Sequence, residues 1–165
     1  MRKALLLLAG LMVFVGAAHG QYTPMAELSL NYSYFRAGSL DGVSMHGGSV
    51  SLAGNVSDWF GVVGDFGAYH GQPDFSGGLN IQTYMVGPRF SARSRSRITP
   101  FGQVLAGGFH GLGTNGFALS AGGGLDVKVS DRFAIRAFQV EYVLLRSQGD
   151  SLNSPRVSAG VVFRF

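Results

Sequence analysis

The sequence predicts an all-β protein in which eight antiparallel strands form an up-and-down barrel. Three observations support this fold class. After residue 21, no apolar stretch repeats with the three-to-four spacing of a helix. Eight segments instead alternate between apolar and polar residues, as strands with two different faces do. The 165 residues also include 26 glycines, which suit closely packed, curved strands. They include no cysteine, which excludes a disulfide framework.

Residues 1–20 predict a secretory signal peptide that is cleaved from the folded domain. Arg2 and Lys3 form a basic start, and residues 4–18 form an apolar run that small residues follow. This run is shorter than the roughly 20 residues that a membrane-spanning helix needs. Removal of Arg2 and Lys3 reduces the 13 basic residues to 11, against 9 acidic ones. The mature domain, residues 21–165, therefore has little excess charge, and we expect no nucleic-acid partner.

The eight strands follow one another with the same alternation. The first has an apolar face of Ala26, Leu28, Leu30, Tyr32 and Tyr34 and a polar face of Glu27, Ser29, Asn31 and Ser33. Seven more strands are expected at residues 43–55, 59–70, 79–91, 98–110, 116–128, 132–145 and 156–165. In the seventh, Arg136 and Glu141 lie on opposite phases, so both point inward only if one extra residue lies between them. This predicts a β-bulge near Ala137.

The connections differ between the two ends of the predicted barrel. Those after even strands are short and polar, whereas those after odd strands are mostly longer and rich in Gly, as at residues 70–78 and 146–155. Tight periplasmic turns and longer outer loops are typical of outer-membrane barrels. Because the strand number is even, we expect both chain ends on the periplasmic side.

The polar face of the strands distinguishes a membrane barrel from a soluble one. A soluble eight-stranded barrel buries its apolar residues around a ligand and presents polar residues to water. Here the polar face consists mainly of Gly, Ser, Ala and a few charges, which fit the narrow interior of eight strands. Larger Leu, Val, Phe and Tyr side chains would then face lipid. We therefore expect a transmembrane barrel, with a soluble ligand-binding barrel as one alternative.

Three segments carry a family resemblance. They are NVSDWFGVVGDF at 55–66, GGLDVKVSDR at 123–132 and the closing VSAGVVFRF at 157–165. Together they resemble the small outer-membrane β-barrel family that includes the OmpA/OmpX-type eight-stranded transmembrane domains. The resemblance implies location in the bacterial outer membrane, contact with its lipids, and recognition of Phe163 and Phe165 by the outer-membrane insertion machinery. Many relatives continue into a peptidoglycan-binding domain, and this chain stops at the last strand, so tethering to the cell wall is not implied.

Seven charged side chains are expected to point into the lumen. They are Glu27, Asp65, Arg89, Asp126, Arg136, Glu141 and Arg164, and all except Asp65 and Glu141 are expected in its periplasmic half. An uncompensated buried charge costs several kcal/mol, so these groups should pair and plug the barrel. A gated ion path or a lumenal acid/base site is the alternative use of the same residues. Eight strands, however, leave room for side chains rather than for a wide pore.

Candidate catalytic and binding residues outside the lumen are few. His46, His70 and His110 are expected near the outer rim, and residues 44–46 and 70–76 supply the Ser, His and Asp types that lipid A-modifying barrels use. No spacing matches such an enzyme, and no ligand set has zinc or calcium spacing. We therefore predict no enzymatic activity, no cofactor and no metal.

Arginine and aromatic residues are expected to meet the membrane boundary. Arg93, Arg95 and Arg97 alternate with Ser in a periplasmic turn, where lipid phosphates or water are the expected partners. Two aromatic girdles are predicted, one of Trp59, Phe60, Phe90, Phe101, Phe163 and Phe165 and one of Tyr34, Phe35, Tyr69, Phe109 and Phe117.

The expected function is a structural or surface-interaction role in the bacterial envelope. The loops would carry any partner specificity, and a monomer is expected because a closed barrel has no free strand edges. A narrow passive channel, or small porin, is the main alternative. An outer-leaflet lipid A-modifying enzyme is the other membrane-bound alternative.

Overall fold

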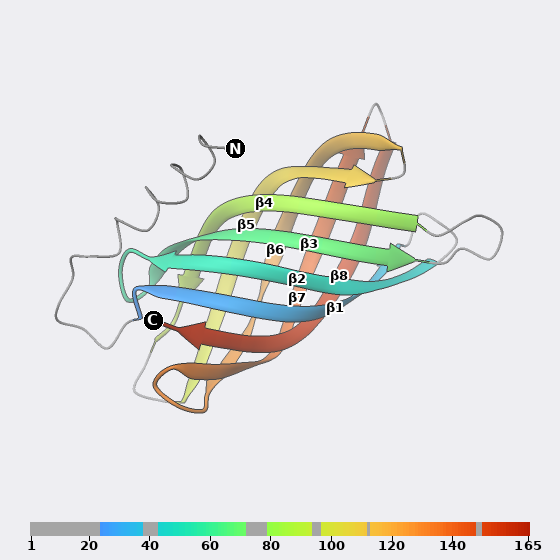
Figure 1. The fold of residues 1–165 in the computed structure, drawn as a ribbon. Helices are drawn as coiled ribbons and strands as arrows, with labels where there is room; N and C mark the ends of the chain where they lie inside the picture. The colour runs from blue at the N-terminus through green and yellow to red at the C-terminus, as the bar shows by residue number, and fades with distance from the viewer. Residues whose placement is uncertain (1–23, 38–42, 72–78, 94–96, 112, 148–149) are drawn as a thin grey trace, which may run out of the picture.

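The computed structural model describes residues 24–37, 43–71, 79–93, 97–111, 113–147 and 150–165. In these residues, eight antiparallel strands pair in chain order and β8 pairs with β1, which closes the barrel (Figure 1). The strands are β1 Ala26–Ala37, β2 Val43–Asn55, β3 Phe60–Gly71, β4 Leu79–Ser91, β5 Ile98–Gly111, β6 Thr114–Lys128, β7 Phe133–Ser147 and β8 Asp150–Arg164. The predicted all-β up-and-down fold is confirmed. The described residues include no helix long and apolar enough to span a membrane.

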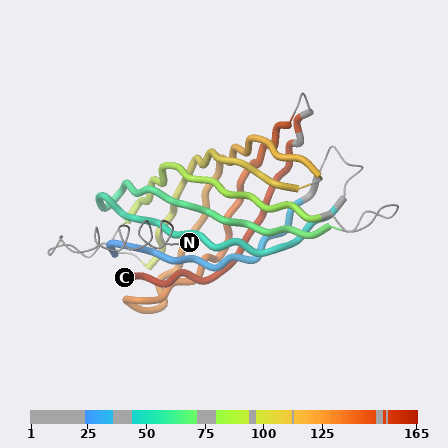
Figure 2. Tube along the Cα trace, turned by 45° about the horizontal axis from the view of Figure 1, so that its top comes forward, coloured from blue at the N-terminus to red at the C-terminus, as the bar shows by residue number. Residues whose placement is uncertain are grey.

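Both ends of the described barrel domain lie at one end of the barrel. The N–H of Ala26 donates to the carbonyl of Phe165 at 3.3 Å, and the N–H of Phe165 donates back at 2.9 Å. The tight turns at residues 56–59 and 129–132 lie at this same end, which we call the terminal end; the opposite end is the loop end. In Figure 2 the strands of the near and far walls cross, as strands tilted to a barrel axis do.

The prediction of a loop at residues 146–155 is wrong. β7 and β8 remain paired as far as Ser147 and Asp150, so this hairpin extends farther at the loop end than predicted. Pro155 suggested a loop, but it lies in an extended strand and faces outward, between the buried Ser154 and Arg156. The alternation of β8 therefore continues through the proline.

The predicted β-bulge is confirmed at Ala137. On the β8 side, the register of β7 shifts between Arg136 and Gln139. Ala137 and Phe138 both point outward, whereas Arg136 and Gln139 are buried. The extra residue changes the phase of the strand, and Glu141 consequently joins Arg136 in the interior.

The outer surface of the barrel carries most of the large apolar side chains. Exposed examples on successive strands are Tyr32, Val50, Phe66, Tyr84, Val104, Phe117, Tyr142 and Val157. The inner surface carries small polar and charged side chains, including Ser29, Asn31, Ser49, Ser51, Thr83, Ser120 and Ser158. This distribution is the reverse of that in a soluble barrel.

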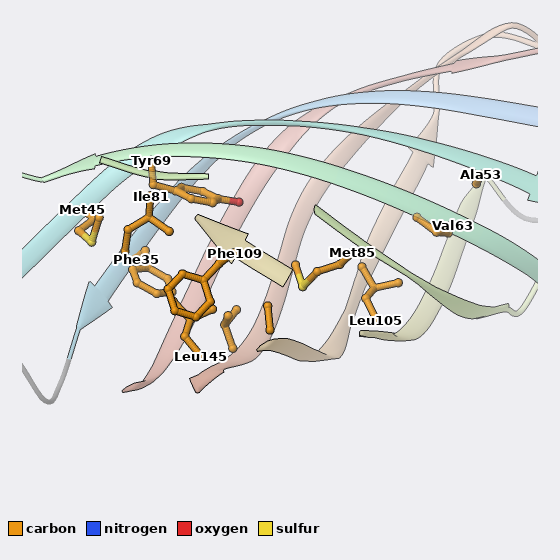
Figure 3. Close-up of a cluster of buried hydrophobic side chains, with 12 residues drawn as sticks. Phe35, Met45, Ala53, Val63, Tyr69, Ile81, Met85, Leu105, Phe109 and Leu145 are labelled. Atoms are coloured by element: carbon orange, nitrogen blue, oxygen red, sulfur yellow. The ribbon is translucent and has the colours of Figure 1, made fainter. Parts of the chain in front are cut away.

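The lumen also contains an apolar cluster that the sequence analysis did not predict. Its members are Phe35, Met45, Ala53, Val63, Tyr69, Ile81, Met85, Leu105, Phe109, Ala118, Val143 and Leu145. Figure 3 shows Phe35, Phe109 and Leu145 gathered near Met45 and Ile81, while Val63 and Ala53 lie farther along the barrel. The rings of Phe35 and Tyr69 stack with centroids 6.0 Å apart. Apolar packing therefore fills much of the lumen toward the loop end.

Four of the aromatic residues assigned to the girdles are instead inside the barrel. Phe35, Tyr69, Phe101 and Phe109 are all buried. The assignment followed their position along each strand and ignored the period of two: Phe35, for example, follows the outward-facing Tyr34 and must face the lumen. The remaining predicted members lie on the outer face, where Trp59, Phe60, Phe90, Phe163, Phe165, Tyr34 and Phe117 are exposed or partly exposed.

Candidate functional site in the barrel lumen

The charged side chains of the lumen form two groups. The terminal cluster contains Glu27, Arg89, Arg93, Asp126, Arg136 and Arg164, which ion pairs link into one network. The middle cluster contains Asp65, Glu141 and Arg156. All seven residues expected in the lumen are buried, and the structure adds Arg93 and Arg156 to them.

Strand register produces three of these ion pairs directly. Glu27 is the cross-strand partner of Arg164, Asp126 that of Arg136, and Glu141 that of Arg156. Directly opposed side chains have Cβ atoms about 4.5–5.5 Å apart, so each carboxylate meets its guanidinium without spanning the lumen. Longer-range pairs then connect these units across the barrel.

Asp126 is the centre of one half of the terminal cluster. Arg136 donates from Nε to its Oδ1 at 2.8 Å and from Nη2 to its Oδ2 at 3.2 Å. Arg89 donates to the same Oδ2 at 2.8 Å. Both guanidinium groups lie over the Phe101 ring, at 4.0 Å and 4.5 Å from its centroid. Phe101 thus packs against the arginines inside the barrel, where it provides a favourable face for their charge.

Glu27 is the centre of the other half. Its Oε1 accepts hydrogen bonds from Arg164 and Arg93, each at 3.1 Å, and its Oε2 lies 3.5 Å from Arg89. Arg93 follows β4 and also donates to the Asn55 amide oxygen at 3.1 Å, so its side chain extends across the terminal mouth of the lumen. The expectation that Arg93 meets only lipid phosphates or water is therefore wrong, because two acceptors within the barrel bind it.

The middle cluster is held by a guanidinium between two carboxylates. Arg156 donates through Nε and Nη2 to Glu141, lies 3.7 Å from Asp65 and donates to the Tyr69 hydroxyl. Ser51 donates to Asp65 at 2.7 Å. Further hydrogen bonds to Glu141 come from Gln103 and Ser120.

Arg156 is not among the residues predicted to face the lumen, although its position in the strand carries the signal. It has the same even phase as the inward-facing Ser158 and Arg164. The expected loop at residues 146–155 would place Arg156 at the first position of the last strand, at the rim of the wall. The paired β7–β8 extension places Arg156 well inside the wall, opposite Glu141.

The histidines His46, His70 and His110 lie on the outer surface at the loop end. His46 and His70 are cross-strand partners, and His70 shares a 2.8 Å hydrogen bond with Asn80. His110 is hydrogen bonded to Asn115. None of these rings shares the lumen with the carboxylates. The Asp and Ser of residues 74 and 76, candidate partners of His70, lie outside the described residues.

The described acidic side chains of the lumen lie in ion pairs with arginines. In the part of the chain that the structure describes, no group of three His, Asp or Glu side chains could hold a metal ion.

Phe163 and Phe165 lie on the outer face, and the Phe163 ring meets Phe133 edge-on at 5.5 Å. Their role in membrane insertion remains a prediction.

At the exposed rim of the terminal end, Lys128 forms an ion pair of 2.6 Å with Asp131. The hydrogen bond and the positive charge of Lys128 hold the pKa of Asp131 below its usual value. Lys128 ends β6 and Asp131 lies in the turn that follows, and this pair differs from the buried clusters in being open to water.

Comparison with known proteins supports the architecture. No protein-family model and no curated protein sequence matches this chain. Its structure is similar to that of Neisserial surface protein A, with a TM-score of 0.74 and 14% identity over 85% of this chain and 97% of that one. It is also similar to Ail, the attachment invasion locus protein of Yersinia pestis, with a TM-score of 0.60 and 20% identity over 87% and 99% of the two chains. A complex of Ail with the heparin analogue sucrose octasulfate gives a TM-score of 0.62 at 19% identity. The fold is therefore that of the small eight-stranded outer-membrane barrels.

Proposed function

We propose that this chain is an outer-membrane barrel protein of the bacterial envelope with a structural or surface-interaction role. The distribution of side chains across the barrel wall carries the proposal: large apolar residues face outward on the strands, and charged residues face inward. Exposed in water, this surface would be a large apolar patch of a kind that soluble monomers rarely show. In a bilayer the same surface matches the hydrocarbon, and the closed sheet satisfies the backbone hydrogen bonds.

Aromatic side chains at the terminal end support a membrane boundary there. The Trp59 ring lies 6.0 Å from Phe90 and 5.7 Å from Phe60, on the outer face beside the turn between β2 and β3. Rings of this kind are enriched where the hydrocarbon meets the headgroups. The terminal end would face the periplasm, after export by way of a cleaved signal peptide and delivery by the insertion machinery.

We propose that the lumen is plugged and does not conduct. The terminal cluster crosses the barrel from Arg93 to Glu27 and from Arg89 to Asp126. The middle cluster and the apolar side chains around Phe109 fill successive levels above it. A passive channel would need a hydrated path through all three levels, so the packing favours a closed barrel.

The proposed role is not enzymatic, and any partner would be met at the loop end. Ail, whose fold this chain shares, is an attachment invasion locus protein and has been crystallised with a heparin analogue. By analogy, a surface interaction at the outer end is the specific form of the proposal. Among the described residues, His46, His70 and His110 lie on the outer wall, apart from the lumenal carboxylates, and this placement does not favour acid–base catalysis.

Cell fractionation combined with electrophoresis tests this proposal. The protein should stay with the outer membrane until detergent is added, and its mobility should change only when the sample is boiled, because a closed barrel resists unfolding by detergent. A matched sample without residues 1–20 should remain in the cytoplasm and show no such change. Release of the full-length product into the soluble periplasm without detergent would overturn the assignment and favour a soluble ligand-binding barrel.

A further inference from the structure

The terminal cluster contains more positive than negative charge. Its two carboxylates belong to Glu27 and Asp126, and its four guanidinium groups belong to Arg89, Arg93, Arg136 and Arg164. Charges removed from water are normally compensated by opposite charges close by. The terminal cluster therefore has a formal excess of two positive charges, which the single excess negative charge of the middle cluster offsets only in part.

Unused hydrogen-bond donors occur at the same place. The Arg164 side chain is only 7% exposed, and its Nη2 has no hydrogen-bond partner. The Arg89 side chain is 4% exposed, and its Nε also lacks a partner, as does the Nε of Arg93. All three arginines converge on Glu27, whose single negative charge they share. In the same cluster one acceptor, Glu27 Oε2, also has no hydrogen-bond partner, so three unused donors face one unused acceptor. Buried N–H groups are rarely left without an acceptor, so the surplus of donors indicates a further one.

The cluster is reached from the terminal end of the barrel. Arg164 is the next-to-last residue, and Arg93 lies just beyond β4. An open cavity of about 460 Å³ lies on the outer rim of this end and is lined by Arg93 together with Asp58, Trp59, Ser91, Ala92, Ile98 and Pro100. The Arg93 and Arg164 side chains are 12% and 7% exposed, so the aqueous side at this end reaches their guanidinium groups without passing the apolar cluster at the loop end.

We propose that Arg89, Arg93 and Arg164 form an anion-binding site at the terminal mouth of the lumen and that its ligand carries a phosphate group. The guanidinium fork matches the oxygens of phosphate, which can accept several N–H donors at once. A phosphate monoester or inorganic phosphate carries a charge of roughly −1.5 to −2 at neutral pH, which matches the excess of the cluster. Chloride offers one negative charge and no fixed set of acceptor directions. The site therefore selects phosphate over a halide.

The test uses residues 21–165 refolded in an uncharged maltoside detergent without phosphate. Sodium phosphate and sodium chloride are titrated at matched ionic strength, and the urea midpoint of unfolding is followed by the fluorescence of Trp59, the only tryptophan. Phosphate should raise the midpoint in a saturable way, and chloride should not. Arg164→Gln should weaken the apparent phosphate affinity at least tenfold.

Two further variants make the test specific. Arg93→Gln alters an arginine outside the strands, so it provides a second reading if Arg164→Gln fails to fold. Arg132→Gln removes an exposed arginine in the turn after β6, at the same end, and should leave the phosphate response unchanged. An equal response to chloride, or an unaltered phosphate response in both lumenal variants, would overturn the site.

A parallel titration distinguishes a free phosphate from a lipid headgroup. Phosphatidylglycerol is added to the same micelles in place of inorganic phosphate. If the lipid alone raises the midpoint and Arg93→Gln removes the effect, the site binds the headgroup of a lipid. If inorganic phosphate alone does so, the ligand is a soluble phosphate from the aqueous side. If neither raises the midpoint in an arginine-dependent way, the proposal is wrong.

Discussion

Replacement of Asp126 by asparagine should strongly destabilise the barrel. The Asp126 carboxylate is fully buried and accepts hydrogen bonds from both Arg136 and Arg89. Asparagine keeps the size of the side chain but removes its charge. Arg136 would then retain only neutral partners, the Gln139 oxygen at 2.8 Å and the Ser29 hydroxyl at 3.4 Å.

The size of the effect follows from which charges lose their partners. Removing one member of a buried ion pair typically costs about 3–5 kcal/mol, because the other charge stays buried without compensation. Arg89 keeps a longer interaction with Glu27 at 3.5 Å, so most of the loss falls on Arg136. We therefore expect Asp126→Asn to lower the free energy of unfolding by about 3–5 kcal/mol. The double variant with Arg136→Gln should lose less than the sum of the two single changes.

Urea unfolding of the refolded barrel in lipid vesicles measures this difference, with the loss of the fast-migrating folded band as a second reading. Asp131→Asn is the matched control, since Asp131 pairs with Lys128 at the exposed rim and should have no measurable effect on stability. Equal stability of Asp126→Asn and Asp131→Asn would refute the account of the terminal cluster. Strict additivity in the double variant would show that Asp126 and Arg136 act independently.

Three further predictions address the bulge, the lumenal packing and conduction. Deletion of Ala137 should turn Glu141 toward lipid and abolish the heat-dependent folded band, whereas deletion of a residue from the exposed turn 129–132 should leave most of the protein folded. Phe109→Ala should lower the free energy of unfolding by about 3–5 kcal/mol in the same urea assay, since the ring is buried in the apolar cluster; an unchanged midpoint would show that the ring contributes no packing. The unaltered barrel should produce no current steps in a planar bilayer, and regular ohmic steps would favour the passive channel.

The period of two made the interior charges predictable from sequence. Residues such as Glu27 and Asp126 lie on the polar phase of regular strands, and the phase conflict between Arg136 and Glu141 located the bulge. Both inferences depend on a geometric rule that holds for any strand: neighbouring side chains point to opposite faces. Tertiary context did not override that rule here.

The wrong predictions concern residues at which another sequence pattern was given more weight than the alternation of side chains between the two faces of a strand. Phe109 was assigned to the outer face because aromatic residues are common at membrane boundaries, although its phase places it inside. Arg156 was missed because Pro155 suggested a loop, and a proline on the outward face of β8 did not end the strand. The Arg93 side chain crosses the terminal mouth of the lumen to bind Glu27. No local sequence pattern predicts this contact, because the two residues are far apart in the chain.

The most direct test of the central claim measures which face of the wall meets lipid. The chain has no cysteine, so single cysteines can be introduced and spin-labelled cleanly. In vesicles, labels at the outward positions of Val50 and Phe66 should be accessible to oxygen and shielded from a water-soluble nickel complex, whereas a label at Ser57 in the terminal turn should show the reverse. Accessibility of the Val50 and Phe66 labels to the nickel complex, equal to that at Ser57, would contradict a lipid-facing outer wall.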